Sequence, residues 1–190
     1  MARSLGSRPP DSLVIDEFVV RRYVDSDARA LMDSVTRSRE HLRPWMPWIK
    51  FEPLDVRARR KLIREWDDAW NRGEDFPMGI FVGDVVVGGT GFHLRGEIDS
   101  VDIGYWVHVD FVGRGIIRRV VKALTTCALQ MDEIQRVVIC HDEANVSSRK
   151  VPEALGFQIF KKEQQEPQAP GECGTHTCWE MTRDEWLRRD

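Results

Sequence analysis

Hydrophobic residues occupy every second position along Val101–Val109, and Asp102, Gly104, Trp106 and His108 stand between them. This period of two predicts a β-strand. Along Ile117–Met131 the apolar residues instead recur every three or four positions, which predicts a helix with one apolar face. A short loop with two glycines, Gly113 and Gly115, separates the two patterns. The chain is therefore predicted to pass from a strand through a glycine loop directly into a helix.

The same two periods predict the other elements. The expected strands are Leu13–Tyr23, Phe76–Val82, Val85–Leu94, Arg136–His141, Phe157–Lys162 and His176–Thr182. The expected helices run from Asp25 or Ser26 to about Thr36, from Asp55 to about Asn71, and from Asn145 to Leu155. Loops are expected over Arg39–Phe51 and Glu163–Gly174. This order predicts a mixed α/β sheet in a single domain over residues 13–190, preceded by a flexible arm over residues 1–12.

A glycine loop that leads into a helix leaves the first N–H groups of that helix without intrahelical partners, at the positive end of the helix dipole. Such an end suits a phosphate, and Arg114, Arg118 and Arg119 add positive charge around it. The loop lacks the Lys-Ser/Thr pair of a P-loop, and Arg118 stands where the dinucleotide-binding motif requires its third glycine. The loop is therefore either an anion site of another kind or an ordinary strand–helix turn.

The composition limits the classes of function. The chain has 190 residues, 42% of them hydrophobic, and a formal net charge of −3. This charge creates no global basic field, so we expect neither nucleic acid nor a membrane as a partner. No apolar run reaches the length of a transmembrane helix, and the first residues lack the apolar core of a secretory signal. We therefore expect a cytoplasmic protein.

The cysteines and histidines predict no metal site. Cys127 and Cys140 lie in apolar patterns and are interpreted as buried thiols, whereas Cys173 and Cys178 could meet across a hairpin. No Cys/His spacing matches a zinc site, and we expect no metal ion. Four histidines have no spacing that gives them a partner: His41, His93, His141 and His176.

Several motifs occur together in a fixed order. They are REHLRPWMPW at Arg39–Trp48, GYW at Gly104–Trp106, the glycine loop, NVSSRKVPEALGF at Asn145–Phe157 and HTCWEMTRDEW at His176–Trp186. Through these motifs nearly the whole chain resembles the GNAT superfamily of acyl-CoA-dependent N-acyltransferases, and within it the branch that acetylates the N-termini of ribosomal proteins. The resemblance implies a mixed, mostly antiparallel central sheet of about seven strands, splayed near its middle and flanked by about four helices. It also implies acetyl-CoA as the co-substrate.

The family binds acyl-CoA in the gap where the central strand separates from its neighbour. The resemblance assigns coenzyme contacts to the end of this strand, the glycine loop, the first helical turn and the N-x-x-S helix. These residues are Trp106, Val107, His108, Val109, Val112, Gly113, Arg114, Gly115, Ile116, Ile117, Arg118, Asn145 and Ser148. Val112 and Ile117 depart from the family pattern Q/R-x-x-G-x-G/A. The β-branched Ile117 is expected to crowd the pyrophosphate, so weak coenzyme binding or a lost activity is an alternative.

Acetyl transfer to an amine needs a base for the ammonium and an acid for the leaving thiolate. Asp102 stands where many relatives carry a glutamate, and it is either this base or a solvated strand residue. Ser148 is the candidate acid, and Asn145 either caps its helix or binds the pantetheine arm. Tyr105 faces the core by alternation, but a bulge would make its phenol a rival acid. Asp102 and His108 share a face but lie roughly 20 Å apart, too far to serve one reacting atom.

The proline loop carries three large side chains, Trp45, Met46 and Trp48, which either line the acceptor pocket, as in relatives, or pin the loop to the core. The implied acceptor is a protein N-terminus or a small amine such as an antibiotic. Transfer is expected to be direct because no nucleophile is well placed. Two alternatives stay open: a GNAT fold that binds or regulates without catalysis, and a GNAT that uses another acyl thioester or anionic ligand. We expect a monomer or a homodimer.

Overall fold

The computed structural model describes residues 3–189, whose centre is one eight-stranded sheet with strand order β1-β2-β3-β4-β5-β6-β8-β7. The strands are β1 (Ser12–Ile15), β2 (Phe18–Arg22), β3 (Asp75–Val82), β4 (Val85–His93), β5 (Ser100–Val107), β6 (Arg136–Asp142), β7 (Gln158–Gln164) and β8 (Thr175–Thr182). The α-helices are α1 (Ala28–Leu42), α2 (Val56–Arg72), α3 (Ile116–Leu129), α4 (Val146–Ala154) and α5 (Arg183–Leu187). The 3-10 helices are η1 (Asp25–Asp27), η2 (Pro47–Phe51) and η3 (Val109–Phe111).

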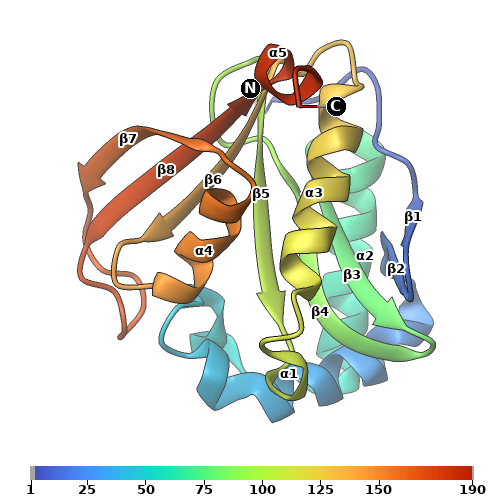
Figure 1. The fold of residues 1–190 in the computed structure, drawn as a ribbon. Helices are drawn as coiled ribbons and strands as arrows, with labels where there is room; N and C mark the ends of the chain where they lie inside the picture. Colours follow the sequence, from blue (N-terminus) through green and yellow to red (C-terminus); the bar gives the residue numbers. More distant parts are fainter. Residues whose placement is uncertain (1–2, 190) are drawn as a thin grey trace.

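Helices cover both faces of the sheet: α3 and α4 lie on one face, and α1 and α2 on the other (Figure 1). A large hydrophobic cluster on the first face contains Leu124 of α3 together with Ile103 of β5 and Ile139 of β6. A smaller cluster on the second face contains Leu31 of α1 and Ile63 of α2. None of the helices within residues 3–189 combines the length and the apolar character that a membrane crossing requires.

The centre of the sheet splits between β5 and β6, which are parallel, whereas all other neighbouring strands are antiparallel. These two strands pair only where Ser100–Asp102 lies opposite Arg136–Val138. Beyond these residues they diverge, and we call the opening the β5–β6 gap (Figure 1). Alternate backbone groups of Ile103–Val107 have no strand partner on that side. The predicted mixed, mostly antiparallel, splayed sheet is thus confirmed.

The sheet has one strand more than predicted, because the stretch Leu13–Tyr23 is a hairpin rather than a single strand. Asp16 between β1 and β2 has a φ of 52°, the left-handed conformation of a tight turn. The first helix also continues to Leu42, past its predicted end, and η2 occupies part of the predicted loop. The short α5 is an additional helix, and Thr182 caps it by accepting a hydrogen bond from the Glu185 N–H.

The segment before β1, expected to be a flexible arm, lies against the domain from residue 3 onward. Leu5 is only 5% exposed and belongs to the larger hydrophobic cluster. Its N–H donates to the Gly73 carbonyl at 2.9 Å, and the Arg8 guanidinium donates to the Trp70 carbonyl at 3.1 Å. These contacts hold the segment against the C-terminal end of α2.

The cysteine pairing differs from the expected one. Cys140 of β6 lies directly opposite Cys178 of β8, and the two form a disulfide. The interpretation of Cys140 as a buried thiol is therefore wrong, because Cys140 is exposed and its sulfur is bonded. Cys127 is half-buried and Cys173 is exposed, and both are free. The register between β6 and β8 decides which cysteines meet.

Candidate active site

The glycine loop lies between η3 and α3, at the open end of the β5–β6 gap (Figure 1). Gly113 and Gly115 have φ values of 78° and 70°, a conformation that glycine adopts without steric cost. A Cβ added to either glycine would meet no heavy atom within 4 Å, so the loop presents open backbone. Gly115 is the N-cap of α3, and its carbonyl accepts from the Arg119 N–H at 3.3 Å. The N–H groups that precede Arg119 in the first turn therefore have no carbonyl partner within the helix, and they can bind an anion.

The arginines around this loop differ in what they contact. The Arg114 guanidinium donates to the Asp110 carbonyl at 2.9 Å and lies 4.7 Å from the centroid of the Phe111 ring. Arg119 points away from the loop, to ion pairs with two carboxylates at the β1–β2 turn. Arg118 is exposed. Two cations close to the helix end can therefore contact a phosphate: Arg118, and Arg114 after a side-chain rotation.

The two residues that depart from the family pattern have different surroundings. Val112 is 49% exposed, so its side chain points to solvent. Ile117 is half-buried and packs against the larger hydrophobic cluster, in which Ile116 is fully buried. The isoleucine that was expected to crowd a pyrophosphate therefore has part of its side chain in the core.

Contacts with α1 hold the end of β5 in place. The Val109 N–H donates to the Ser38 hydroxyl of α1 at 3.1 Å. His108 is buried, and its Nδ1 accepts from the Asp110 N–H at 3.0 Å. Burial lowers the pKa of His108, so the ring stays neutral at pH 7 and keeps this bond. His108, which the family resemblance assigns to coenzyme binding, thus also caps η3.

Two of the three candidate catalytic side chains meet in the β5–β6 gap. The Tyr105 hydroxyl lies 3.0 Å from Ser148 Oγ and 3.1 Å from the Ser148 carbonyl oxygen. Tyr105 faces the core side of β5, and the register with β4 runs through it without a bulge. The side chain is long enough to cross to α4, so no bulge is needed. Burial raises the pKa of Tyr105 to about 12, and the phenol keeps its proton at neutral pH.

Asn145 caps α4, as one of its two interpretations predicts. Its Oδ1 accepts a hydrogen bond from the Ser148 N–H at 3.1 Å. This bond fixes the first turn of α4 and with it the position of the Ser148 side chain. Because the cap uses Oδ1, the Nδ2 amide group is the part of Asn145 that is left for a ligand.

The third candidate catalytic residue, Asp102, lies on the opposite face of β5, at the closed end of the gap. Burial raises its pKa, while the charges of Arg95 and His93 lower it. Its Oδ2 is buried and has no hydrogen-bond partner in the described part of the chain. A Cβ added to Gly96 would lie 3.6 Å from this atom, so the carboxylate faces the β4–β5 connection. Asp102 and His108 lie at opposite ends of β5, and the fold does not bring them together.

The three candidate acceptor residues lie between α1 and α2, on the face of the sheet that carries Trp106. The Trp48 and Trp106 rings meet edge-on with their centroids 6.3 Å apart. Met46 and Trp48 also pack against the smaller hydrophobic cluster, and Trp45 is half-buried. These side chains therefore pin their segment to the core and at the same time border the end of β5.

A backbone contact joins this segment to the far side of the β5–β6 gap. The Gly171 N–H in the β7–β8 connection donates to the Pro44 carbonyl at 2.9 Å. A Cβ added to Gly171 would lie 2.7 Å from the Pro44 oxygen, so a larger residue would force the two segments apart. Both segments lie below α4 at the lower left of Figure 1. Segments from the two halves of the sheet thus border one side of the gap.

A histidine–carboxylate pair lies on the face of the sheet that carries Trp106, although the spacing of the residues in the sequence did not predict it. His93 lies directly opposite Asp75, and its Nδ1 is 2.6 Å from Asp75 Oδ1. An unbroken β3–β4 hairpin around its two-residue turn would place Glu74 opposite His93. A register shift between Ile80 and Phe81 moves Asp75 into that position instead. The pairing of His93 with Asp75 could have been predicted only if the position of this bulge had been known.

One group of side chains could ligate a metal by composition. The ligand atoms of Asp142, Glu172 and His176 lie within 4.8 Å of one another. Both carboxylates already accept hydrogen bonds from backbone N–H groups, Asp142 from three and Glu172 from two. These bonds shape the turns that join β6 and β8 to their connections, and we assign no metal to the group.

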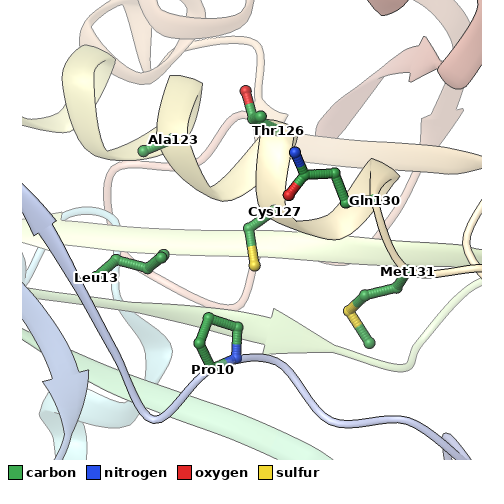
Figure 2. Close-up of a pocket in the computed structure, with 7 residues that line it drawn as sticks. All are labelled: Pro10, Leu13, Ala123, Thr126, Cys127, Gln130 and Met131. Atoms are coloured by element: carbon green, nitrogen blue, oxygen red, sulfur yellow. The ribbon is translucent and has the colours of Figure 1, made fainter.

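A surface pocket lies on the β1 side of α3, away from the gap. It has a volume of about 450 Å³ and is lined by Pro10, Leu13, Ala123, Thr126, Cys127, Gln130 and Met131 (Figure 2). Burial raises the pKa of the Cys127 thiol, which makes it a weak nucleophile at neutral pH. The pocket holds none of the candidate site residues.

Comparison with known proteins indicates the family and the fold of the chain. The sequence matches the acetyltransferase (GNAT) domain family over residues 17–158. It is 26% identical over 145 residues to the protein named Putative ribosomal N-acetyltransferase YdaF of Bacillus subtilis (strain 168), which covers 76% of this chain and 79% of that protein. The fold is similar to that of RimL, named a ribosomal L7/L12 alpha-N-protein acetyltransferase and solved in complex with coenzyme A, with a TM-score of 0.83, 22% identity, and coverage of 92% of this chain and 99% of that one.

A second similar structure is the microcin C7 self immunity acetyltransferase MccE in complex with acetyl-CoA and AMP. Its TM-score is 0.83, its identity 18%, and the match covers 91% of this chain and 97% of that one. At these identities the two structures support the fold alone. The family match spans most of the chain and includes the splayed strands and the glycine loop. The chain therefore belongs to the acetyltransferase (GNAT) domain family.

Proposed function

We propose that the protein is an acetyl-CoA-dependent N-acetyltransferase that acts on the free amino group of a protein N-terminus. The observation that carries the proposal is the Tyr105–Ser148 hydroxyl pair in the β5–β6 gap, with the open N-terminus of α3 at the mouth of the gap. A proton donor beside an anion site is what transfer from a phosphate-bearing thioester requires. Membership of the GNAT family supports the same reaction.

The proposed coenzyme site follows β5 from the glycine loop into the gap. The first N–H groups of α3 and the backbone of Gly113–Gly115 hold the pyrophosphate, with Arg118 as a counter-charge. The backbone of Trp106–Val109 and the Asn145 amide group hydrogen-bond the pantetheine arm. When bound, the coenzyme supplies the activated acetyl group. The complexes of similar proteins with coenzyme A and acetyl-CoA support acetyl-CoA as the co-substrate.

Transfer is proposed to be direct. The amine nitrogen attacks the thioester carbonyl carbon, and the C–S bond breaks as the C–N bond forms. A phenol whose pKa is about 12 does not by itself protonate a thiolate, whose pKa is about 8.5. The Tyr105–Ser148 pair therefore donates a hydrogen bond to the developing thiolate and relays a proton that it regains from the attacking nitrogen. Cys140 is bonded to Cys178 and so offers no thiol for a covalent intermediate.

The acceptor is proposed to enter on the face of Trp106, past Trp45, Met46 and Trp48. These side chains stand beside the gap and leave the α4 side to the coenzyme. The names of the relatives, which refer to ribosomal proteins and to their α-amino groups, support a peptide N-terminus as the acceptor.

Acetyl-CoA should stabilise the protein against heat. At about 100 times its dissociation constant, a ligand that binds only the folded state adds about 2.7 kcal/mol to the free energy of unfolding. Thermal melting with acetyl-CoA, with desulfo-coenzyme A and with adenosine checks this prediction. The first two should raise the melting temperature and adenosine should not. An unchanged melting temperature in millimolar acetyl-CoA would contradict the proposal and favour a GNAT fold without catalysis.

Replacing Gly115 by valine should weaken acetyl-CoA binding at least tenfold, about 1.4 kcal/mol. A β-branched side chain is strained at positive φ and would cover the open backbone. Gly83 is the matched control, because its φ is also positive, at 55°, and a Cβ there also meets nothing within 4 Å. Calorimetry should show normal affinity for Gly83→Val. Equal affinities of both variants would show that the loop does not bind the coenzyme.

A further inference from the structure

The face of the sheet opposite α4 carries a histidine near the closed end of the β5–β6 gap. His93, the last residue of β4, lies directly opposite Asp102 of β5. Its Nε2 would be 3.0 Å from a Cβ added to Gly104, so the ring lies over this glycine. Gly104 directly precedes Tyr105 and is the second residue beyond the last β5–β6 pair. The imidazole therefore reaches the border of the gap because Gly104 has no side chain.

Asp75 sets the tautomer and the orientation of this ring. The 2.6 Å contact joins His93 Nδ1 to Asp75 Oδ1, and an ionised carboxylate only accepts hydrogen bonds. In the neutral ring the proton is therefore on Nδ1, and Nε2 carries a lone pair that faces Gly104. The His93 side chain is 17% exposed, so it is enclosed but reachable.

The histidine and the hydroxyl pair lie on opposite sides of the same stretch of β5. Successive residues of a strand point to opposite faces. The ring lies over Gly104 on the α1–α2 side, whereas the Tyr105 side chain reaches Ser148 on the α4 side. An amine that enters from the acceptor side meets the histidine, and the leaving sulfur faces the hydroxyls. Amine acylation needs a base that acts on the nitrogen and a proton donor that acts on the leaving sulfur.

We infer that His93 is the general base of the acetyl transfer and that Asp75 is its positioning residue, an inference that rests on the proposed function. Nε2 takes one proton from the substrate ammonium, and the neutral amine then uses its lone pair to form the C–N bond. The C–S bond breaks, and its electron pair stays on sulfur. The second proton lost by the nitrogen balances the one that the thiolate gains through the hydroxyl pair. His93 releases the first proton to solvent.

The acidity of the amine selects the class of acceptor. In model peptides the pKa is about 7.7–8.0 for an α-amino group and about 10.4 for lysine. An α-ammonium therefore gives up its proton to a given base more readily than a lysine ammonium does. The proposed base thus suits a peptide N-terminus rather than a lysine side chain.

Charged groups from several elements lie near His93. Asp75 of β3 and Asp102 of β5 lie opposite it in the sheet. Asp102 in turn interacts with Arg95 in the β4–β5 connection and with Arg3 of the N-terminal segment. The positive charges of the two arginines offset the negative charge of Asp102. The Asp102 carboxylate faces the β4–β5 connection rather than Gly104. Asp75 is then the carboxylate that is bonded to the ring. This arrangement favours His93 over Asp102 as the group that touches the amine.

Steady-state acetylation of a peptide with a free N-terminal serine, measured from about pH 6 to about pH 9, tests the inference. His93→Gln should lower kcat/KM about 10²-fold near pH 6.5, where the amine is protonated. The deficit should shrink to less than about tenfold at pH 9, where most of the amine is neutral without a base. Asp75→Asn should displace the rise of kcat/KM with pH, and it provides the test if His93→Gln does not fold. His41→Gln, on the exposed side of α1, is the control with an unchanged profile.

Calorimetry with acetyl-CoA separates the inference from the proposed function. Wild type and His93→Gln should bind acetyl-CoA with affinities within about twofold, since the histidine acts on the amine. If the wild type is active and His93→Gln loses nothing, or the same factor at every pH, His93 is not the base and the proposed function stands. If the wild type binds acetyl-CoA but acetylates no peptide, the proposed function fails and the role of His93 fails with it.

Discussion

Replacing Ser148 by alanine should lower kcat for acetyl transfer by about 10²-fold or more. Ser148 Oγ lies 3.0 Å from the Tyr105 hydroxyl, so its loss interrupts the proton relay to the thiolate. The cap of α4 survives, because Asn145 accepts from the Ser148 backbone N–H and not from its hydroxyl. Steady-state kinetics should show the loss in kcat, while calorimetry should show almost unchanged acetyl-CoA affinity.

Three further variants test how the hydroxyl pair works. Tyr105→Phe should also lower kcat, and because the two hydroxyls act as one unit the double variant should lose little more than the worse single variant. Ser147→Ala removes an exposed hydroxyl one residue away and should leave kcat unchanged. Full activity of both single variants would exclude the pair from the proton path.

Replacing Glu52 by alanine should lower the free energy of unfolding by about 3–5 kcal/mol. Glu52 Oε1 lies 2.8 Å from Arg59 Nη2, and the two side chains are only 4% and 3% exposed. Removal of the carboxylate leaves a buried guanidinium without its counter-charge. Glu52 also accepts from the Leu54 N–H at 2.8 Å, so the same change loosens the connection from η2 to α2. Urea unfolding measures the loss.

An exposed pair on α2 is the control for this prediction. Lys61 and Glu65 are 3.5 Å apart, and their side chains are 80% and 56% exposed. Because water screens such a pair, Glu65→Ala should leave the unfolding midpoint nearly unchanged. A loss of less than about 1 kcal/mol for Glu52→Ala would show that the buried pair is not needed for stability.

The strand, the glycine loop and the helix from Val101 to Met131 were predictable, because each depends on residues close together in sequence. Period two, positive-φ glycines and an apolar helical face need no knowledge of distant contacts. The meeting of Tyr105 with Ser148 was not predictable in this way. It depends on how far β5 and β6 diverge, and alternation alone leaves the phenol in the core.

Strand register explains the other differences. The Cys140–Cys178 disulfide follows from the alignment of β6 with β8, two strands that the α4–β7 segment separates in sequence. The His93–Asp75 pair follows from one bulge in the β3–β4 hairpin. A shift of one residue changes every cross-strand partner. Local patterns predict that strands exist but not which side chains face each other.

Mass spectrometry of two peptides after incubation with acetyl-CoA tests the central claim most directly. One peptide has a free N-terminal serine and no lysine, and the other has a blocked N-terminus and one lysine. We predict that the first peptide gains one acetyl group on its α-amine, that the second gains none, and that Ser148→Ala slows the gain. A wild-type protein that binds acetyl-CoA but leaves the free N-terminus unmodified would contradict the account.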